Sequence, residues 1–268
     1  MKIAFSTLGC PGWSWDDILS TARDLGFDGI EVRGVENELY MPKAAPFLEK
    51  NAKATMERLK KLILEIPSLT SACYLFDREN SEANLKEGMD YTALAARLGI
   101  PYVRVLGDKN PEPGKDIDLV LVAKNLRKLD EFAAGKGVTL LVETNGVLAN
   151  SDRMLELLKM AGCSNVGVLW DVHHPFRYFG EPVEKTWSAL KEYIKFVHIK
   201  DSIMENGKIR YKMMGHGGVP VREALLLMKN EGYTGFVSLE WVKRWCMDLE
   251  EPGVVFSHFV NYVKGVLE

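Results

Sequence analysis

Four polar residues stand at or near the ends of short apolar runs in the second half of the chain. They are Glu143, Asp171, His198 and Glu240, in the runs 138–143, 166–175, 196–200 and 236–240. Three carboxylates and an imidazole suit a hard or borderline divalent ion, so Mn²⁺, Mg²⁺ or Co²⁺ is favoured, while Zn²⁺ or Fe²⁺ is compatible. Clustered carboxylates without a cation would repel one another. The residue types therefore predict a metal site.

Further polar and aromatic residues lie where they could contact a small ligand. These substrate-binding candidates are Trp13, Glu31, Arg104, His174, Lys200 and His216. Three of them have a plainer alternative: Arg104 could neutralise a buried carboxylate, Trp13 could serve packing alone, and His216 could be an ordinary loop residue. Of the adjacent His173 and His174, we expect one to contact substrate and the other to be structural.

The elements that must position these residues alternate regularly between strand and helix. Strands are predicted at 2–7, 29–33, within 64–72, and at 101–107, 138–143, 165–171, 196–200 and 236–240. Helices are predicted at 14–25, 45–61, 84–98, 117–134, 151–160, 183–193, 221–229 and 252–266. Ser14 and Asp17 have the spacing of a capping box. This alternation predicts an α/β fold, a (β/α)8 TIM barrel in one domain over residues 1–268.

A doubly wound open sheet is the alternative, but it usually has a glycine-rich phosphate turn after its first strand. The segment 7–12 does not match that turn. In a barrel, side chains at the carboxyl ends of the strands face one cavity. The four polar residues come from consecutive strands, so we expect them to converge there.

Composition limits the classes of partner. The chain has 268 residues, 47% of them hydrophobic, and a formal net charge of −3, which favours a small-molecule substrate and argues against nucleic acid. No apolar run is long enough to span a membrane. Four widely spaced cysteines suggest neither a disulfide framework nor a thiolate zinc site. We expect a cytoplasmic protein, and a homo-oligomer stays open.

The quartet, together with the segments LLVETNG, VGVLWDVHH, VHIKD and VSLEW, resembles the xylose isomerase-like barrel superfamily of sugar isomerases and epimerases. This resemblance covers nearly the whole chain. It implies that Glu143 and Glu240 bind the metal and exchange a proton with the substrate, that Asp171 and His198 complete the coordination, and that His174 contacts a substrate oxygen. The implied reaction passes through an enediolate.

Two positions depart from the pattern of that superfamily. Members often have a histidine at the end of the third strand, and residues 68–73 offer none. A loop that commonly holds an acidic residue between glycines here reads Gly215-His216-Gly217-Gly218. Both departures bear on the substrate, and neither affects the predicted metal ligands.

The leading hypothesis is a metal-dependent isomerase or epimerase acting on a keto-sugar or keto-polyol. An inosose-type dehydratase on the same metal site is the closest alternative, because water elimination begins with the same proton removal. A non-catalytic sugar-binding barrel is the alternative of another class, although it has no need for three converging carboxylates. A repair nuclease would need several metals, for which five histidines are few.

Overall fold

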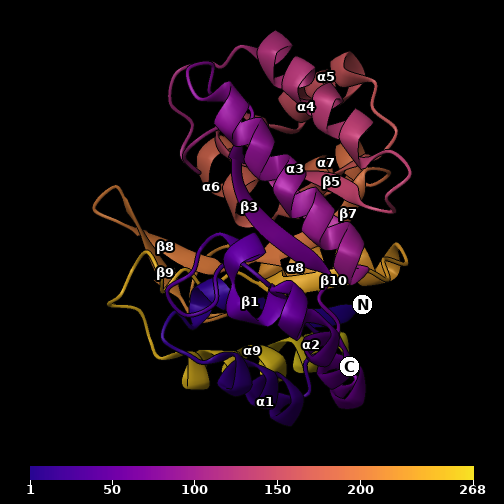
Figure 1. The fold of residues 1–268 in the computed structure, drawn as a ribbon. Coiled ribbons are helices and arrows are strands. Elements are labelled where there is room, and N and C mark those ends of the chain that lie inside the picture. Colours follow the sequence, from indigo (N-terminus) through magenta and orange to yellow (C-terminus); the bar gives the residue numbers. More distant parts are fainter. The chain divides into compact units, whose positions relative to one another are not determined.

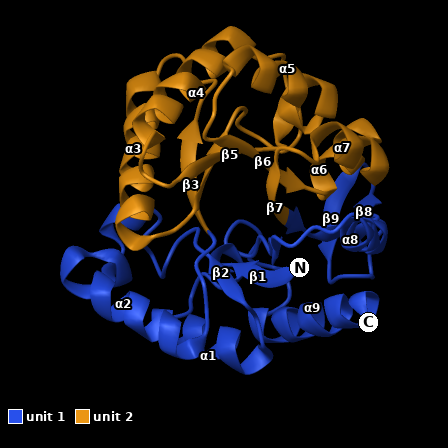
Figure 2. Cartoon of the chain, turned by 90° about the vertical axis from the view of Figure 1, so that its right-hand side faces the viewer, with its two compact units in different colours: residues 1–67, 198–268 blue, residues 68–197 orange.

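The computed structural model describes residues 1–268 and divides into two compact units. Unit 1 consists of residues 1–67 and 198–268, and unit 2 of residues 68–197 (Figure 2). Strands β1 to β7 and β10 are the eight parallel strands of the sheet, and they alternate with helices. The predicted fold class, an α/β TIM barrel, is confirmed.

Unit 1 begins and ends the chain. Its elements are β1 (Lys2–Ser6), η1 (Thr7–Gly9), α1 (Trp15–Leu25), β2 (Gly29–Glu31), η2 (Met41–Lys43), η3 (Ala45–Phe47), α2 (Glu49–Leu62), β8 (Asp201–Glu205), β9 (Lys208–Lys212), α8 (Val221–Asn230), β10 (Phe236–Leu239) and α9 (Pro252–Leu267). Strand β1 pairs in parallel with β2 on one side and β10 on the other. Helices α1, α2 and α9 run along one side of β1 and β2 (Figure 2).

Unit 2 holds the middle of the chain. Its elements are β3 (Ser68–Tyr74), α3 (Ser81–Leu98), β4 (Tyr102–Leu106), α4 (Leu119–Ala133), β5 (Thr139–Glu143), η4 (Gly146–Ala149), α5 (Ser151–Ala161), β6 (Val166–Asp171), α6 (His173–Phe179) and α7 (Val183–Leu190). Strands β3 to β6 pair in parallel in chain order. Helix α3 runs alongside β3 (Figure 1). Strand β7 (Ile194–Ile199) crosses from unit 2 into unit 1.

The alternation of side chains along β1 explains how unit 1 separates its core from its site. Phe5 points toward the helices, where its ring stacks on that of Phe256 with centroids 4.3 Å apart. The opposite face carries the small residues Ala4 and Ser6. Large apolar groups therefore fill the space under the helices and leave the other face of the strand open to polar neighbours.

Several helix ends agree with their predicted signals. Ser14 and Asp17 form the expected capping box at the start of α1. That helix ends at Gly26, which adopts the left-handed conformation that glycine accepts at least cost. Asn150 caps α5 through hydrogen bonds from the amides of Asp152 and Arg153.

Strand β3 extends past its predicted range to Tyr74, and the structure differs more widely from the predicted elements in three other places. Helix α2 begins at Glu49, because Leu48 is extended and separates it from the short turn 45–47. Helix α6 was not predicted, since it has only seven residues and carries Pro175 in its first turn, where proline is tolerated. The β8–β9 hairpin was also missed, although Asn206 and Gly207 both have positive φ and form its turn.

Candidate functional site

In unit 2, Glu143 and Asp171 are the last residues of β5 and β6, and both are buried. Thr144, which follows Glu143, ties the two strand ends together. Its Oγ1 accepts a hydrogen bond from the amide of Asp171 at 2.8 Å and donates to the carbonyl oxygen of the same residue at 3.2 Å. The two predicted metal ligands of this unit therefore have fixed backbone positions.

A buried arginine lies against one oxygen of Glu143. Arg104 is opposite Leu141 in the β4–β5 register, so its side chain lies on the same face as that of Glu143. The Arg104 Nε atom is 3.3 Å from Glu143 Oε2. Of its two predicted roles, the internal ion pair is the one for which the structure gives a contact. Substrate binding by Arg104 stays a prediction.

The other oxygen of Glu143 faces His174, which lies in the first turn of α6. His174 Nδ1 is 3.7 Å from Glu143 Oε1 and donates a hydrogen bond of 2.9 Å to the carbonyl oxygen of Thr144. Because a carbonyl only accepts, Nδ1 carries a proton. The Nε2 atom lies 3.5 Å from Asp171 Oδ2. The ring is thus held with Nε2 toward the aspartate.

His173 contributes to the same corner through its backbone, since its amide donates to Asp171 Oδ1 at 2.9 Å. Donor atoms of Asp171, His173 and His174 lie within 4.8 Å of one another, and all three side chains are buried. His174 therefore faces both carboxylates, and the amide of His173 orients one of them. That one of the two histidines contacts substrate stays a prediction.

In unit 1, His198 from β7 and Glu240, directly after β10, form the second half of the predicted quartet. His198 Nδ1 is 3.5 Å from Glu240 Oε1. The other ring nitrogen, Nε2, is 2.8 Å from Glu31 Oε1. Glu31 was predicted to bind substrate, and the structure places its carboxylate against His198 instead. Direct contact of Glu31 with a substrate stays a prediction without a supporting contact.

Lys200 lies two residues beyond His198 on the same face, as the alternation of strand residues requires. Its Nζ contacts Glu240 Oε2, and both side chains are buried. The two glutamates thus have matching surroundings. Oε2 of Glu143 contacts Arg104, and Oε2 of Glu240 contacts Lys200. Oε1 of Glu143 faces His174, and Oε1 of Glu240 faces His198.

Trp13 and His216 lie against helix α9. The ring of Trp13 meets Phe256 edge-on, with centroids 5.7 Å apart. His216 is exposed, and its ring centroid lies 5.5 Å from that of His258. Both residues keep their predicted substrate role as a proposal only.

Asp201 was not predicted as a functional residue, yet it organises the loop that carries His216. Its Oδ2 accepts hydrogen bonds from the amides of Gly215 and Gly217, and its Oδ1 accepts from those of Ser202 and Val219. The sequence signal was its place two residues after the end of strand β7, where polar residues of a barrel gather. Thr144 and Ser238 were missed as well, because single hydroxyl residues carry no chemical signature of their own.

The chemistry of the four donor side chains fits a divalent ion. Unit 2 offers the carboxylates of Glu143 and Asp171, and unit 1 offers the imidazole of His198 and the carboxylate of Glu240. All four are buried, and buried carboxylates are commonly paired with cations or bound to metals. Oxygen-rich sets with one nitrogen suit Mn²⁺, Mg²⁺ or Co²⁺, and they also accept Zn²⁺ or Fe²⁺.

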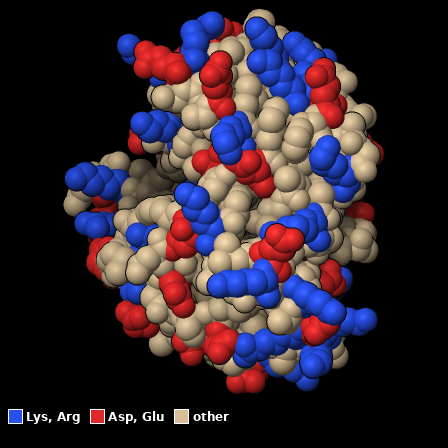
Figure 3. Space-filling view, viewed as in Figure 1, with Lys and Arg blue, Asp and Glu red and all other residues tan.

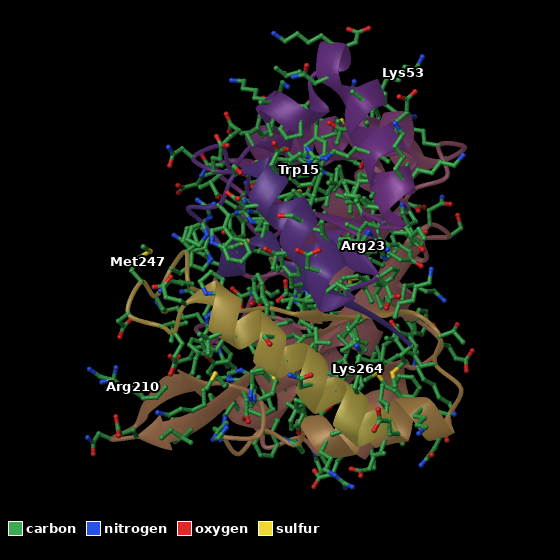
Figure 4. The ribbon with its side chains drawn as sticks, turned by 90° about the horizontal axis from the view of Figure 1, so that it is seen from below. Trp15, Arg23, Lys53, Arg210, Met247 and Lys264 are labelled. Carbon is green, nitrogen blue, oxygen red and sulfur yellow. The ribbon has the colours of Figure 1, made fainter.

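One face of the molecule shows how its charged side chains are distributed. Basic and acidic side chains alternate on the face shown in Figure 3, without an extended patch of one sign. Arg210 on the β8–β9 hairpin and Met247 after β10 lie at the outer margin of unit 1 (Figure 4). None of the helices has the length and apolar character needed to cross a membrane.

Comparison with protein families gives one match that covers most of the chain. A family model described as "Xylose isomerase-like TIM barrel" matches residues 19–255, which span both units. The match therefore extends from the first helix, through all of unit 2, to the beginning of the last helix.

Two characterised relatives are similar along the chain. A fructoselysine 3-epimerase from Escherichia coli O157:H7 is 23% identical over 283 residues, covering 100% of this chain and 98% of the relative. An inosose isomerase from Halalkalibacterium halodurans is 26% identical over 235 residues, covering 80% of this chain and 78% of the relative. One relative is thus named as an epimerase and the other as an isomerase.

Three solved structures have the same fold. The probable 3-DHS dehydratase AsbF from Bacillus anthracis has a TM-score of 0.80 at 19% identity and covers 98% of this chain and 99% of its own. The IOLI protein with a bound zinc atom has a TM-score of 0.78 at 18% identity, with coverage of 100% and 98%. A xylose isomerase-like barrel from Mycobacterium smegmatis in complex with magnesium has a TM-score of 0.74 at 20% identity, with coverage of 99% and 96%.

Proposed function

Because the chain belongs to the xylose isomerase-like TIM barrel family, we propose that this enzyme of the isomerase or epimerase type acts on a keto-sugar or keto-polyol with one divalent metal ion. The proposed ligands are Glu143, Asp171, His198 and Glu240. Mn²⁺, Mg²⁺ or Co²⁺ is favoured by the oxygen-rich set, and the zinc and magnesium found in two structures of the same fold keep Zn²⁺ within the proposal.

The observation that carries the proposal is the matched environment of the two glutamates. In each, a buried cation contacts Oε2 and a histidine faces Oε1. Each carboxylate has one oxygen held by a fixed cation and the other directed at a histidine. Such a pair is suited to take up and return a proton at a defined place. A single general base would need only one such group.

A divalent ion, when bound, would polarise the carbonyl and the neighbouring hydroxyl of the substrate and so acidify the C–H group between them. Glu143 and Glu240 then divide the proton transfer: one, as a carboxylate, removes the proton to give an enediolate, and the other, as a carboxylic acid, donates a proton. The donated proton goes to the same carbon in an epimerisation and to the neighbouring carbon in an isomerisation. His174, with its Nδ1 proton committed to Thr144, presents Nε2 to a substrate oxygen. Arg104 and Lys200 hold the two carboxylates in place.

Epimerisation or isomerisation is favoured over elimination of water because the two characterised relatives are an epimerase and an isomerase. A lyase of the inosose dehydratase type would begin with the same proton removal, so the alternative is decided by the product.

The test is incubation of the metal-loaded protein in D₂O with fructoselysine, D-allulose and inososes, followed by NMR and mass spectrometry. The proposal predicts deuterium at the carbon beside the carbonyl, together with an epimer or isomer of unchanged oxygen content. A product that has lost water would establish the lyase instead. Binding of a sugar without any exchange would indicate the non-catalytic barrel.

A further inference from the structure

Glu31 is a buried carboxylate at the end of β2, and no element of the proposed reaction uses it directly. Its side chain is fully buried, as are those of His198 and Ser238. An isolated carboxylate in such a place is costly, and the cost falls only when hydrogen bonds satisfy its oxygens. The hydrogen-bond partners of its two oxygens therefore indicate what it does.

Each oxygen of Glu31 has a defined partner. Oε1 is 2.8 Å from Nε2 of His198, and Oε2 accepts a hydrogen bond of 2.7 Å from the hydroxyl of Ser238. All three residues lie in unit 1, on strands β2, β7 and β10. The serine leaves the carboxylate no freedom to turn away from the histidine.

Strand β1 makes this arrangement possible. It lies between β2 and β10, with Ser6 opposite Glu31 and Ala4 opposite Ser238. Paired residues of parallel strands point to the same face, so only the small side chains of Ala4 and Ser6 stand between Glu31 and Ser238. A larger residue at either position would block the hydrogen bond.

The contact decides which nitrogen of His198 can bind a metal. An ionised carboxylate only accepts hydrogen bonds, so Nε2 must carry the proton and Nδ1 keeps its lone pair. Nδ1 is the nitrogen that lies 3.5 Å from Glu240 Oε1, on the side of the second proposed ligand. Histidines that bind metals typically donate their other N–H group to such a carboxylate.

We propose that Glu31, anchored by Ser238, is a positioning residue that holds His198 in the Nε2–H tautomer with Nδ1 directed at the metal. This inference rests on the proposed function, because it assumes that His198 binds the ion. Glu31 thereby takes a role different from the substrate contact predicted for it.

The test has two readouts on the wild type and on Glu31→Gln and Ser238→Ala variants. Nitrogen NMR of histidine-labelled, metal-free protein reports the tautomer of His198, and calorimetric titration with Mn²⁺ reports affinity. In Glu31→Gln the amide nitrogen can donate to Nε2, which moves the ring proton to Nδ1, so we expect that shift in the NMR spectrum and an affinity loss of about 10–100-fold. Ser238→Ala should give the same changes to a smaller degree.

Glu181→Gln is the matched control. Glu181 is also buried and accepts from a hydroxyl, that of Thr186 at 2.8 Å, but it contacts no histidine. The Glu181→Gln variant should change the stability of the protein without changing the tautomer of His198. The inference is overturned if both variants keep the wild-type tautomer and affinity. Wild-type protein that binds no divalent ion would overturn the proposed function instead, whereas the metal-free NMR spectra would still test the tautomer.

Discussion

The ammonium group of Lys200 contacts Oε2 of Glu240, and neither side chain is accessible to more than a small degree. Removing one member of a buried ion pair leaves an uncompensated charge, while removing both does not. We therefore predict that Lys200→Met alone lowers the free energy of unfolding by about 3–5 kcal/mol. The double variant Lys200→Met with Glu240→Gln should be less destabilised than the sum of the single effects.

Urea unfolding measures this coupling as a double-mutant cycle. The four proteins are the wild type, Lys200→Met, Glu240→Gln and the double variant, all without metal. Additive effects, within about 0.5 kcal/mol, would mean that the two groups do not depend on each other. The pair would then be an incidental contact, and Lys200 would return to its predicted role as a substrate ligand.

Neutralising either proposed proton carrier should abolish the exchange chemistry. Glu143→Gln and Glu240→Gln keep the size of the side chain but cannot accept the proton, so we expect kcat to fall by about 100–10,000-fold. Turnover on a keto-sugar and deuterium incorporation from D₂O should fall together. The control is Glu181→Gln, which removes a buried carboxylate from outside the proposed site. Wild-type turnover in both glutamate variants would disprove the mechanism with two carboxylates.

The loop held by Asp201 should not tolerate a side chain at Gly217. A Cβ atom built there would lie 2.0 Å from Asp201 Oδ1 and 2.6 Å from the amide of Ser202. Gly217→Ala should therefore break the hydrogen bonds of Asp201 and cost about 1–3 kcal/mol. In the control Gly114→Ala, a Cβ atom has no neighbour within 4 Å. Equal urea midpoints for the two variants would contradict this account of the loop.

The buried cysteines predict a loss of stability in alkali. Burial raises the pKa of the Cys73 thiol from 9.0 to about 12, so the folded state keeps a proton that the unfolded state loses. Stability is therefore unaffected below about pH 9 and falls as pH rises from there toward about pH 12. At about pH 10 the Cys73 contribution is a loss of about 1.4 kcal/mol.

Urea unfolding at a series of pH values measures this slope, with Cys73→Ala as the comparison. The variant should lose less stability per pH unit than the wild type, because one of the thiols with a raised pKa is absent. Parallel curves for the two proteins would show that Cys73 does not cause the alkaline loss.

The sequence was sufficient for the fold class because the same signals recur along the chain. The capping box at Ser14 and Asp17 and the helix end at Gly26 are local features, and each agrees with the structure. Helix α6 and the β8–β9 hairpin were beyond that reasoning for different causes. Helix α6 is too short to show a periodic pattern. The hairpin has a turn signal in the sequence, the pair Asn206-Gly207, whose residues both adopt positive φ.

The site was less accessible to sequence reasoning than the fold. The position of a residue at a strand end predicts that it faces the cavity, but it does not say which neighbour it contacts. A substrate contact was predicted for Glu31 and Arg104, with an internal ion pair as the alternative for Arg104. The structure shows each of them against one of the proposed ligands, His198 and Glu143. Such pairings depend on the register of neighbouring strands and on small residues between them, as at Ala4.

Metal binding by the four proposed ligands is tested by calorimetric titration of the metal-free protein with Mn²⁺, repeated on Asp171→Asn and His198→Ala, one proposed ligand from each unit. We expect one ion per chain in the wild type, a large loss of affinity in both variants, and an unchanged affinity in Glu181→Gln. A wild type that binds no ion, or variants that bind it as tightly as the wild type, would rule out the proposed metal site.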